Sequence, residues 1–462
     1  MKNFLRILSS SVISIICSLV IAILIPIKLG VTEFGYWQIF FLYSGFLGLF
    51  TFGFLDGIHL KYSGLNKNNT NKKLFRTYFR FLNILLFSIC FMFITIIYFL
   101  PINPQKETIL YYLSINLILF NLNGFFIHYY QVTSEFKMYS VSLTLDKIFF
   151  VFLIMPILFI QDFNNYKIVI FANVASRLIL LIIQLNYSKE ILFGERYRIF
   201  RIKKLILRNI KRGSLLTVSL LISILLFSYP RIIVERTFPI ELFSIFSLSM
   251  SILSMVVQIL SSSSAYVYSY LKKIDKSQIN FVLKNISNIL SLLTPLILFS
   301  YYIIYILISE FMPRYNGIFE YMFMVFPVII FQLRNNILII NSYKIISLEK
   351  NLFYNNIFTF ITIVFIFLFT NLYFSLDIKM IVSIFLVMNI FYSILMTYRI
   401  NKVRILDLSY PINEMILSLI FILVNYLFNA LLAISIMSFI FLIYYLIERK
   451  KMVCVKNTLK RI

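Results

Sequence analysis

The stretch from Ser188 to Gly213, SKEILFGERYRIFRIKKLILRNIKRG, determines how the rest of the chain is interpreted. It holds nine Lys or Arg against two Glu, whereas the segments on both sides consist mainly of long apolar runs. Such a charged stretch cannot lie in the hydrocarbon core of a bilayer, and Lys and Arg are retained on the cytoplasmic side of membranes. We therefore predict a basic cytoplasmic connector at 188–213 that divides the chain in two.

The composition indicates a polytopic helical membrane protein. Of 462 residues, 61% are hydrophobic and 13% are charged, about half of the ~25% charged residues that soluble domains carry. Apolar runs of roughly 20 residues recur along the whole chain, and this length crosses a bilayer as a helix. No long polar region remains for a soluble catalytic domain.

Apolar length and flanking charges predict fourteen membrane spans, six before the connector and eight after it. Only Asn429 separates the last two, so twelve and fourteen spans both stay open. The predicted spans are Ile7–Ile27, Tyr36–Leu55, Phe81–Leu100, Thr108–Tyr130, Val141–Ile160, Tyr166–Tyr187, Ser214–Val234, Leu242–Ser262, Ile286–Ser309, Tyr321–Tyr343, Phe353–Leu372, Met380–Tyr398, Ile412–Phe428 and Ala430–Ile447.

The distribution of basic residues supports this topology. With both termini placed in the cytoplasm, 34 of the 43 Lys and Arg fall in cytoplasmic segments and 6 on the outer side. This asymmetry alternates along the chain and indicates an even number of spans. Because the net charge of +25 is divided among short loops, we predict no nucleic-acid partner. The predicted location is the cytoplasmic membrane of a bacterium, since the residue usage is typical of AT-rich bacterial genes.

The predicted fold class is an all-α membrane protein of two six-helix lobes followed by a C-terminal helix pair. The lobes are residues 1–187 and 214–398, and residues 399–462 form the helix pair with a basic tail. Six spans on either side of a connector are typical of transporters built from repeats. The connector is predicted to form an amphipathic helix on the cytoplasmic leaflet, with a solvated linker as the alternative. Its apolar stripe is Ile199, Ile202, Ile206 and Ile210.

Three arginines lie inside predicted spans: Arg177, Arg231 and Arg334. A charge at the bilayer centre costs a few kcal/mol, so such residues usually face a cavity or a partner. We identify no acidic residue at a comparable depth. The arginines are therefore predicted to bind an anionic substrate in a water-filled cavity. The alternative is snorkelling, or a structural hydrogen bond to a backbone carbonyl.

Acidic and histidine side chains near span ends are candidate coupling or gate residues. Asp56 and His59 close the second predicted span, and Asp146 lies near the start of the fifth. A helix end that faces the cytoplasm also accounts for Asp56 and His59, without any role in transport. Gly53 and Gly57 in the same segment have the spacing of close helix packing.

Metal sites and cofactors are not predicted. The two histidines, His59 and His128, are far apart in sequence, and we interpret His128 as interfacial. The three cysteines have no paired spacing, and no triad or phosphate-binding loop is present. We therefore do not expect an enzyme.

The order of these features resembles that of bacterial polysaccharide flippases, the O-antigen and teichoic-acid type translocases of the MATE-related superfamily. The central basic loop after six spans and the total of twelve to fourteen spans are similar to that family. The residues that carry the resemblance are Pro26, Gly30, Glu33-Phe34-Gly35, Trp37 and the segment Gly53-Phe54-Leu55-Asp56-Gly57.

The resemblance implies flipping of an oligosaccharide linked to polyprenyl pyrophosphate, for the biosynthesis of surface polysaccharide. The pyrophosphate would be bound by the arginines, and two lobes would alternate between inward and outward openings. Membrane lipids are further implied partners, and a polysaccharide polymerase is a candidate one. The sequence does not identify the coupling ion.

Two other functions stay open at this point. A membrane polysaccharide polymerase or ligase would use the same substrate, but such enzymes need a sizeable outward loop, and the longest here is about Glu310–Glu320. A MATE-type exporter of small molecules would need carboxylates within its lobes. The deep charges identified in this chain are positive, which ranks the exporter last.

Overall fold

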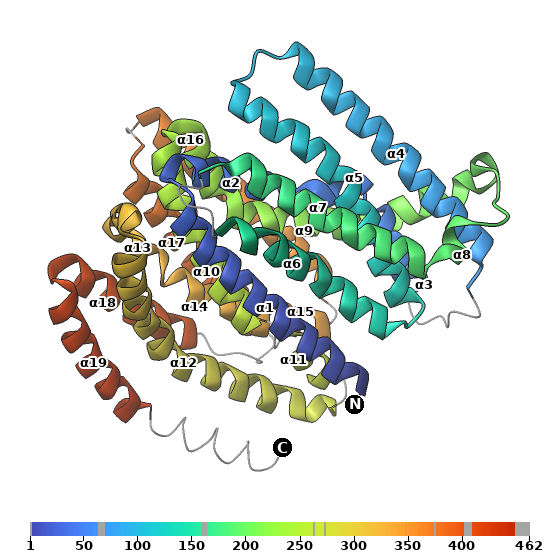
Figure 1. The fold of residues 1–462 in the computed structure, drawn as a ribbon. Helices are drawn as coiled ribbons and strands as arrows, with labels where there is room; N and C mark the ends of the chain where they lie inside the picture. Colours follow the sequence, from blue (N-terminus) through green and yellow to red (C-terminus); the bar gives the residue numbers. More distant parts are fainter. Residues whose placement is uncertain are drawn as a thin grey trace. The chain divides into compact units, whose positions relative to one another are not determined.

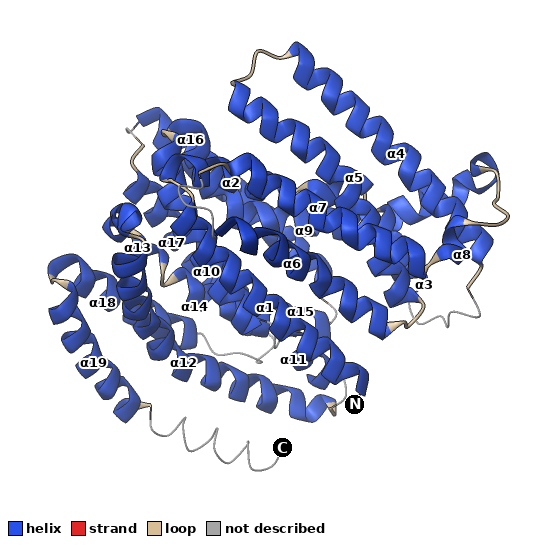
Figure 2. Ribbon diagram, in the orientation of Figure 1, coloured by secondary structure: helices blue, strands red, loops and turns tan. Residues whose placement is uncertain are grey.

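All regular structure in the described part of the chain is helical, and Figure 2 shows helices joined by short loops. Contacts divide the chain into two compact units, a first unit Met1–Ser244 and a second unit Ile245–Ile462. The basic tail predicted within 399–462 falls largely outside the described residues. The computed structural model describes residues 2–62, 70–158, 164–261, 264–271, 274–346, 348–373, 376–401 and 409–448.

The first unit holds α1 to α9, and α10 begins at its end (Figure 1). Its elements are α1 (Lys2–Lys28), α2 (Val31–Ser44), η1 (Leu47–Thr51), α3 (Phe54–Tyr62), α4 (Lys72–Phe99), α5 (Pro104–Val132), α6 (Phe136–Leu158), α7 (Tyr166–Tyr187), α8 (Lys189–Leu192), η3 (Ile199–Ile202) and α9 (Lys203–Thr237).

The second unit holds most of α10 and all later helices. A π-helical segment, η5, interrupts the chain's tenth predicted span, Tyr321–Tyr343, between α14 and α15. Its elements are α10 (Ile240–Ser261), α11 (Ser264–Leu271), α12 (Lys276–Phe311), η4 (Pro313–Glu320), α13 (Met322–Val325), α14 (Val328–Leu333), η5 (Arg334–Ile339), α15 (Ile340–Ile345), α16 (Glu349–Tyr373), α17 (Ile378–Asn401), α18 (Ser409–Leu427) and α19 (Ala430–Ile447).

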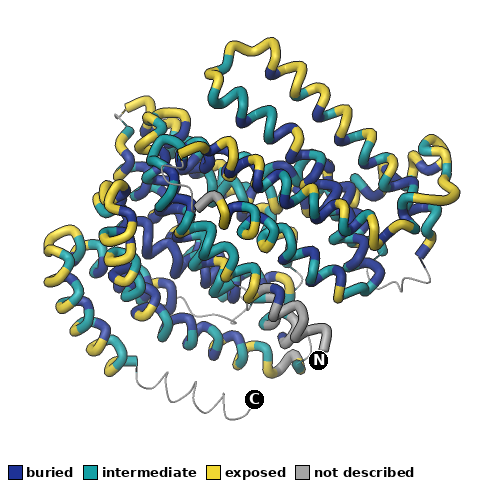
Figure 3. Tube along the Cα trace, in the orientation of Figure 1, coloured by how far each residue is buried: buried dark blue, intermediate teal, exposed yellow. Residues whose placement is uncertain are grey.

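The chain is a multi-pass membrane protein. Twelve described helices are long and apolar enough to cross a membrane; the bent pair α2–η1 and α3 gives a thirteenth, and α1 contributes a shorter apolar segment. On α4, Phe91, Tyr98 and Phe99 are about three-quarters exposed, and Figure 3 shows exposed positions along this helix. So large an apolar surface is unfavourable in water but suited to lipid. The predicted all-helical fold with twelve to fourteen spans is confirmed.

The second predicted span is broken rather than straight. Phe52 and Gly53 both have positive φ, and α3 continues at 60° to the helix before the break. A Cβ on Gly57 would overlap the backbone of Asn209 on α9, and one on Gly213 would overlap the backbone of Gly53. The close packing predicted for Gly53 and Gly57 is thus confirmed, with α9 as the partner.

The basic connector does not form the separate surface helix that the sequence predicts. Residues Ile199–Ile202 make one 3-10 turn, and α9 then begins at Lys203 and runs for 35 residues into the next span. Ile202 and Ile206 are buried, so their stripe faces protein rather than lipid. The prediction was wrong because the same stripe continues to Gly213, where α9 packs against α3.

The predicted lobes, residues 1–187 and 214–398, describe parts that are expected to move, and they stay a prediction. Compactness places α9 in the first unit, because α3 and α9 approach closely at their glycines. The C-terminal helix pair predicted after residue 398 is present as α18 and α19, which pack together and against α12 in the second unit.

Candidate functional site

Arg177 is embedded among α5, α6 and α7 in the first unit. Its Nη1 donates to Asn116 Oδ1 at 2.6 Å, and its guanidinium lies over the ring of Phe120, 5.2 Å from the centroid. The carboxylate of Asp146 on α6 is near enough to act electrostatically on Arg177. The structure thus brings together two predicted site residues, Arg177 and Asp146, that are 31 positions apart in the sequence.

Polar contacts extend this group toward α1 and α2. Asn116 Nδ2 donates to Ser44 Oγ of α2 at 3.2 Å, so one amide joins the arginine to the broken span. On the other side, Lys147 Nζ donates to Ser18 Oγ of α1 at 2.9 Å. Five helices therefore meet at a polar core that would be costly in lipid without a function or full pairing. Sequence reasoning missed Asn116 and Ser44, because neutral residues within spans are common.

Arg231 lies on α9 and is 6% exposed. Its Nη2 donates to Gln38 Oε1 of α2 at 2.6 Å. Its Nε has no hydrogen-bond partner within the described residues, although the atom is buried. A buried guanidinium with an unused donor is energetically unfavourable, so this position is suited to an anion that supplies the missing acceptor.

Glu235 lies one helical turn beyond Arg231, and the sequence analysis did not single it out. Its carboxylate accepts from Lys106 Nζ at 2.5 Å and from Tyr43 OH at 3.1 Å. These bonds direct the carboxylate toward α5 and α2, and Arg231 bonds to Gln38 instead. The four-residue spacing from Arg231 was a signal that could have identified Glu235, since residues four apart share a helix face.

Arg334 begins the π-helical segment of the second unit, and it is not the unpaired charge that the sequence analysis expects. Its Nε donates to Glu414 Oε2 at 2.7 Å, its Nη2 donates to Glu414 Oε1, and its Nη1 donates to Ser287 Oγ at 3.1 Å. Both side chains of the ion pair are 1% exposed. The expectation of no deep acid was wrong, because Glu414 lies just inside the thirteenth predicted span. A bidentate carboxylate neutralises Arg334 in this conformation.

Asp56, His59 and His128 gather beside the break in the second span. The rings of His59 and His128 lie 5.5 Å apart, and Thr217 Oγ1 of α9 donates to Asp56 Oδ2 at 2.6 Å. The charge of Asp56 also acts on His128. The only two histidines of the chain therefore meet next to a predicted gate residue, and the interfacial interpretation of His128 missed this contact.

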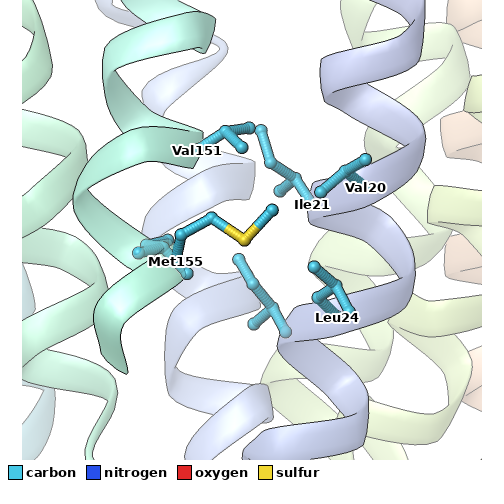
Figure 4. Close-up of a pocket in the computed structure, with 7 residues that line it drawn as sticks. Val20, Ile21, Leu24, Val151 and Met155 are labelled. Carbon is cyan, nitrogen blue, oxygen red and sulfur yellow. The ribbon is translucent and has the colours of Figure 1, made fainter. Parts of the chain in front are cut away.

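An apolar pocket lies between α1 and α6 (Figure 4). Val20, Ile21 and Leu24 line it from α1, and Val151 and Met155 line it from α6. The lining contains only aliphatic side chains and methionine, so it offers no donor to a sugar or a phosphate. Within the described residues, no group of three His, Cys, Asp or Glu is arranged to hold a metal ion.

Comparison with solved structures identifies the fold. The chain is similar to a structure of lipid II flippase MurJ in an inward closed conformation, with 13% identity, a TM-score of 0.69, and 98% of this chain and 99% of that chain covered. It is also similar to a MOP superfamily transporter from Pyrococcus furiosus whose binding pocket is described as reversed in polarity, with 12% identity, a TM-score of 0.52, and 88% and 96% covered. No protein-family model and no curated protein matches the sequence. The chain has the fold of MOP superfamily transporters.

Proposed function

We propose that this chain flips an oligosaccharide linked to polyprenyl pyrophosphate across the cytoplasmic membrane, for surface polysaccharide biosynthesis. The proposal is supported by the fold, which this chain shares over nearly its whole length with a protein described as a lipid II flippase. A lipid-linked precursor carries a pyrophosphate, and a site for it must provide positive charge and hydrogen-bond donors within the membrane.

The observation that carries the proposal is Arg231. Its guanidinium is buried in a membrane-embedded unit, and its Nε has no acceptor within the described residues. A pyrophosphate oxygen would supply that acceptor and compensate the buried charge. Glu235, the nearest acid along α9, is already bound by Lys106 and Tyr43, and therefore does not compete for the position.

Arg177 supports the same site through α2. Arg231 binds Gln38 of α2 directly, and Arg177 reaches Ser44 of α2 through Asn116. The two arginines thus make polar contacts along one short helix, α2, which precedes η1 and the break in the second span. We propose that a pyrophosphate engages Arg231 first and Arg177 as α2 shifts. Arg334 stays a predicted substrate-binding residue. Its guanidinium must separate from Glu414 before it can bind a substrate.

The remaining elements of the proposal concern location and partners. Both termini and the basic connector are placed in the cytoplasm, because Lys and Arg concentrate on that side. The parts proposed to move are the lobes at residues 1–187 and 214–398. A polysaccharide polymerase that accepts the flipped unit on the outer face is the proposed protein partner.

Replacement of Arg231 or Arg177 by Gln tests this site. We expect each variant to lower export of surface polysaccharide at least about tenfold, since a charged hydrogen bond contributes about 1.5–3 kcal/mol and each 1.4 kcal/mol is a factor of ten. The measurement is surface polysaccharide per cell in a strain without the chromosomal copy, normalised to membrane levels of the protein.

Arg314→Gln is the matched control, because Arg314 is exposed in η4, and it should export at the wild-type level. Full export by both test variants would contradict the proposed substrate site at Arg231 and Arg177. The location of accumulated lipid-linked units tests the function itself. Units retained on the cytoplasmic face agree with a flippase, whereas single units on the outer face would indicate a polymerase.

The Asp56, His59 and His128 group is proposed to form part of the gate. Thr217 Oγ1 donates to Asp56 Oδ2 at 2.6 Å, so this carboxylate joins α3 to α9 beside the two imidazole rings. We expect Asp56→Asn to lower export of surface polysaccharide at unchanged membrane levels of the protein. Asp275→Asn, at an exposed helix start, should export at the wild-type level. Full export by Asp56→Asn would contradict this role.

A further inference from the structure

The basic connector separates its charges onto two sides. Its two acids, Glu190 and Glu195, face the start of α4, where they pair with Lys72 at 2.7 Å and Lys73 at 2.8 Å. The hydrogen bond from Lys73 lowers the pKa of Glu195. The acids of the connector are therefore already engaged within the protein.

Backbone contacts fix the connector on α4. Arg76 Nε donates to Glu190 O at 2.7 Å, and its Nη1 donates to Glu195 O at 3.2 Å. Tyr197 N donates to Thr77 Oγ1 at 2.9 Å. Gly194, with φ +113°, lets the chain turn tightly against the Arg76 guanidinium, where a Cβ would collide. These bonds attach residues 190–197 of the connector to the start of α4.

The later cations of the connector are exposed. We define the basic face as the seven exposed cations at Arg198, Arg201, Lys203, Lys204, Arg208, Lys211 and Arg212. Within the described part of the chain, none of the seven forms an ion pair with a carboxylate. Seven like charges within fifteen residues repel one another, so binding of an external anion at this face would be favourable.

Apolar side chains are interleaved with the basic face. Phe200 in η3 is 85% exposed, and Leu207 on α9 is 52% exposed. Lys211 lies one turn beyond Leu207 on the same helix. The same exposed stripe continues to Leu215 and beyond, inside the membrane-spanning part of α9. The side chains of the basic face therefore pass without a break into a lipid-facing surface. An exposed aromatic ring among cations at the end of a span is typical of the membrane interface.

We propose that the basic face binds the phosphate groups of anionic phospholipids in the adjoining leaflet, with Phe200 and Leu207 inserted among the upper acyl chains. The charge complementarity and the continuity with a membrane span favour a lipid surface over a soluble acidic partner. The inference needs only that α9 spans the membrane, and it stands independently of the proposed substrate. The bound lipids would hold the start of α9 and the attached α4 at a fixed depth.

Native mass spectrometry of the purified full-length chain tests the proposal. The probes are phosphatidylglycerol and phosphatidylcholine with identical acyl chains. We expect the wild-type protein to retain phosphatidylglycerol preferentially. The triple variant Arg198→Gln, Arg201→Gln, Arg208→Gln should lose that preference at least about fivefold, because each neutralised cation removes one attraction to the anionic surface. Retention of phosphatidylcholine should not change.

A second triple variant, Lys167→Gln, Arg314→Gln, Lys379→Gln, is the matched control. These exposed cations lie at other helix ends, and their removal changes the net charge equally, so it should leave lipid retention unchanged. Equal loss in both triple variants would overturn the proposal, because the effect would then follow net charge alone. Farnesyl pyrophosphate forms a third arm. Binding of this prenyl pyrophosphate at the basic face without retention of phosphatidylglycerol would also overturn it, and would assign the face to substrate docking.

Discussion

Replacement of Arg334 by Met is expected to lower the free energy of unfolding by about 3–5 kcal/mol, the cost of leaving one member of a buried ion pair without its partner. Glu414 would keep its place with almost no exposure to water and with its two strongest donors removed. With the guanidinium removed, the buried carboxylate must take up a proton or draw in water. The expected observation is a large fall in the melting temperature in detergent.

Glu414→Gln should be destabilising for the complementary reason, since it leaves the guanidinium without a counter-charge. The double variant Arg334→Met, Glu414→Met is the decisive control. Burial of two apolar side chains of similar volume in place of the pair is often neutral or stabilising, so the double variant should recover most of the lost melting temperature. Single and double variants of equal stability would contradict a tightly coupled pair.

The same three variants separate a structural role of Arg334 from a role in transport. If Arg334 leaves Glu414 to bind substrate, the double variant should be stable but defective in polysaccharide export. If the pair only joins α18 to the tenth span, the double variant should export normally. The π-helical start at Arg334 is relevant here, because π-helical turns occur frequently at functional sites and disturb the regular helix ladder.

The sequence was sufficient to predict an all-helical fold with twelve to fourteen spans, because span length and flanking charges are local properties. It was also sufficient to single out Arg177, Arg231 and Arg334, since a charge within an apolar run is conspicuous. It did not identify the partners. Glu414 is 80 positions from Arg334, and no periodic pattern connects two residues on different helices.

The basic connector shows a second limit of prediction from sequence. Isoleucines at spacings of three and four define an apolar stripe correctly, but they do not say whether lipid or protein covers it. Ile202 and Ile206 are buried, whereas Phe200 and Leu207 on the other side are exposed. The deciding feature was Gly213, which lets α9 approach α3 along the isoleucine side. To predict that protein covers this stripe, Gly53 before α3, Gly57 within α3 and Gly213 on α9 had to be recognised together.

The close packing of α3 against α9 predicts a large effect of glycine substitutions on stability. Gly57→Ala is expected to destabilise the first unit by about 1–3 kcal/mol or more, the range for inserting extra atoms into a packed core. The added methyl group would overlap the carbonyl oxygen of Asn209, and a backbone atom cannot move aside as a flexible side chain does. Gly213→Ala should have a similar effect, because its Cβ would overlap the backbone of Gly53. The measurements are melting temperature and the monodisperse fraction on size-exclusion chromatography.

Gly124→Ala is the matched control, since Gly124 also lies within a helix, α5, but its Cβ would meet only Leu55 Cδ1 at an ordinary 3.5 Å. Alanine is favoured over glycine in a helix by about 1 kcal/mol, so this variant should be as stable as the wild type or more stable. The same helix propensity acts on Gly57→Ala, and any loss of stability there must therefore come from the contact with α9. Equal melting temperatures for Gly57→Ala and Gly124→Ala would show that α3 and α9 do not pack at this distance.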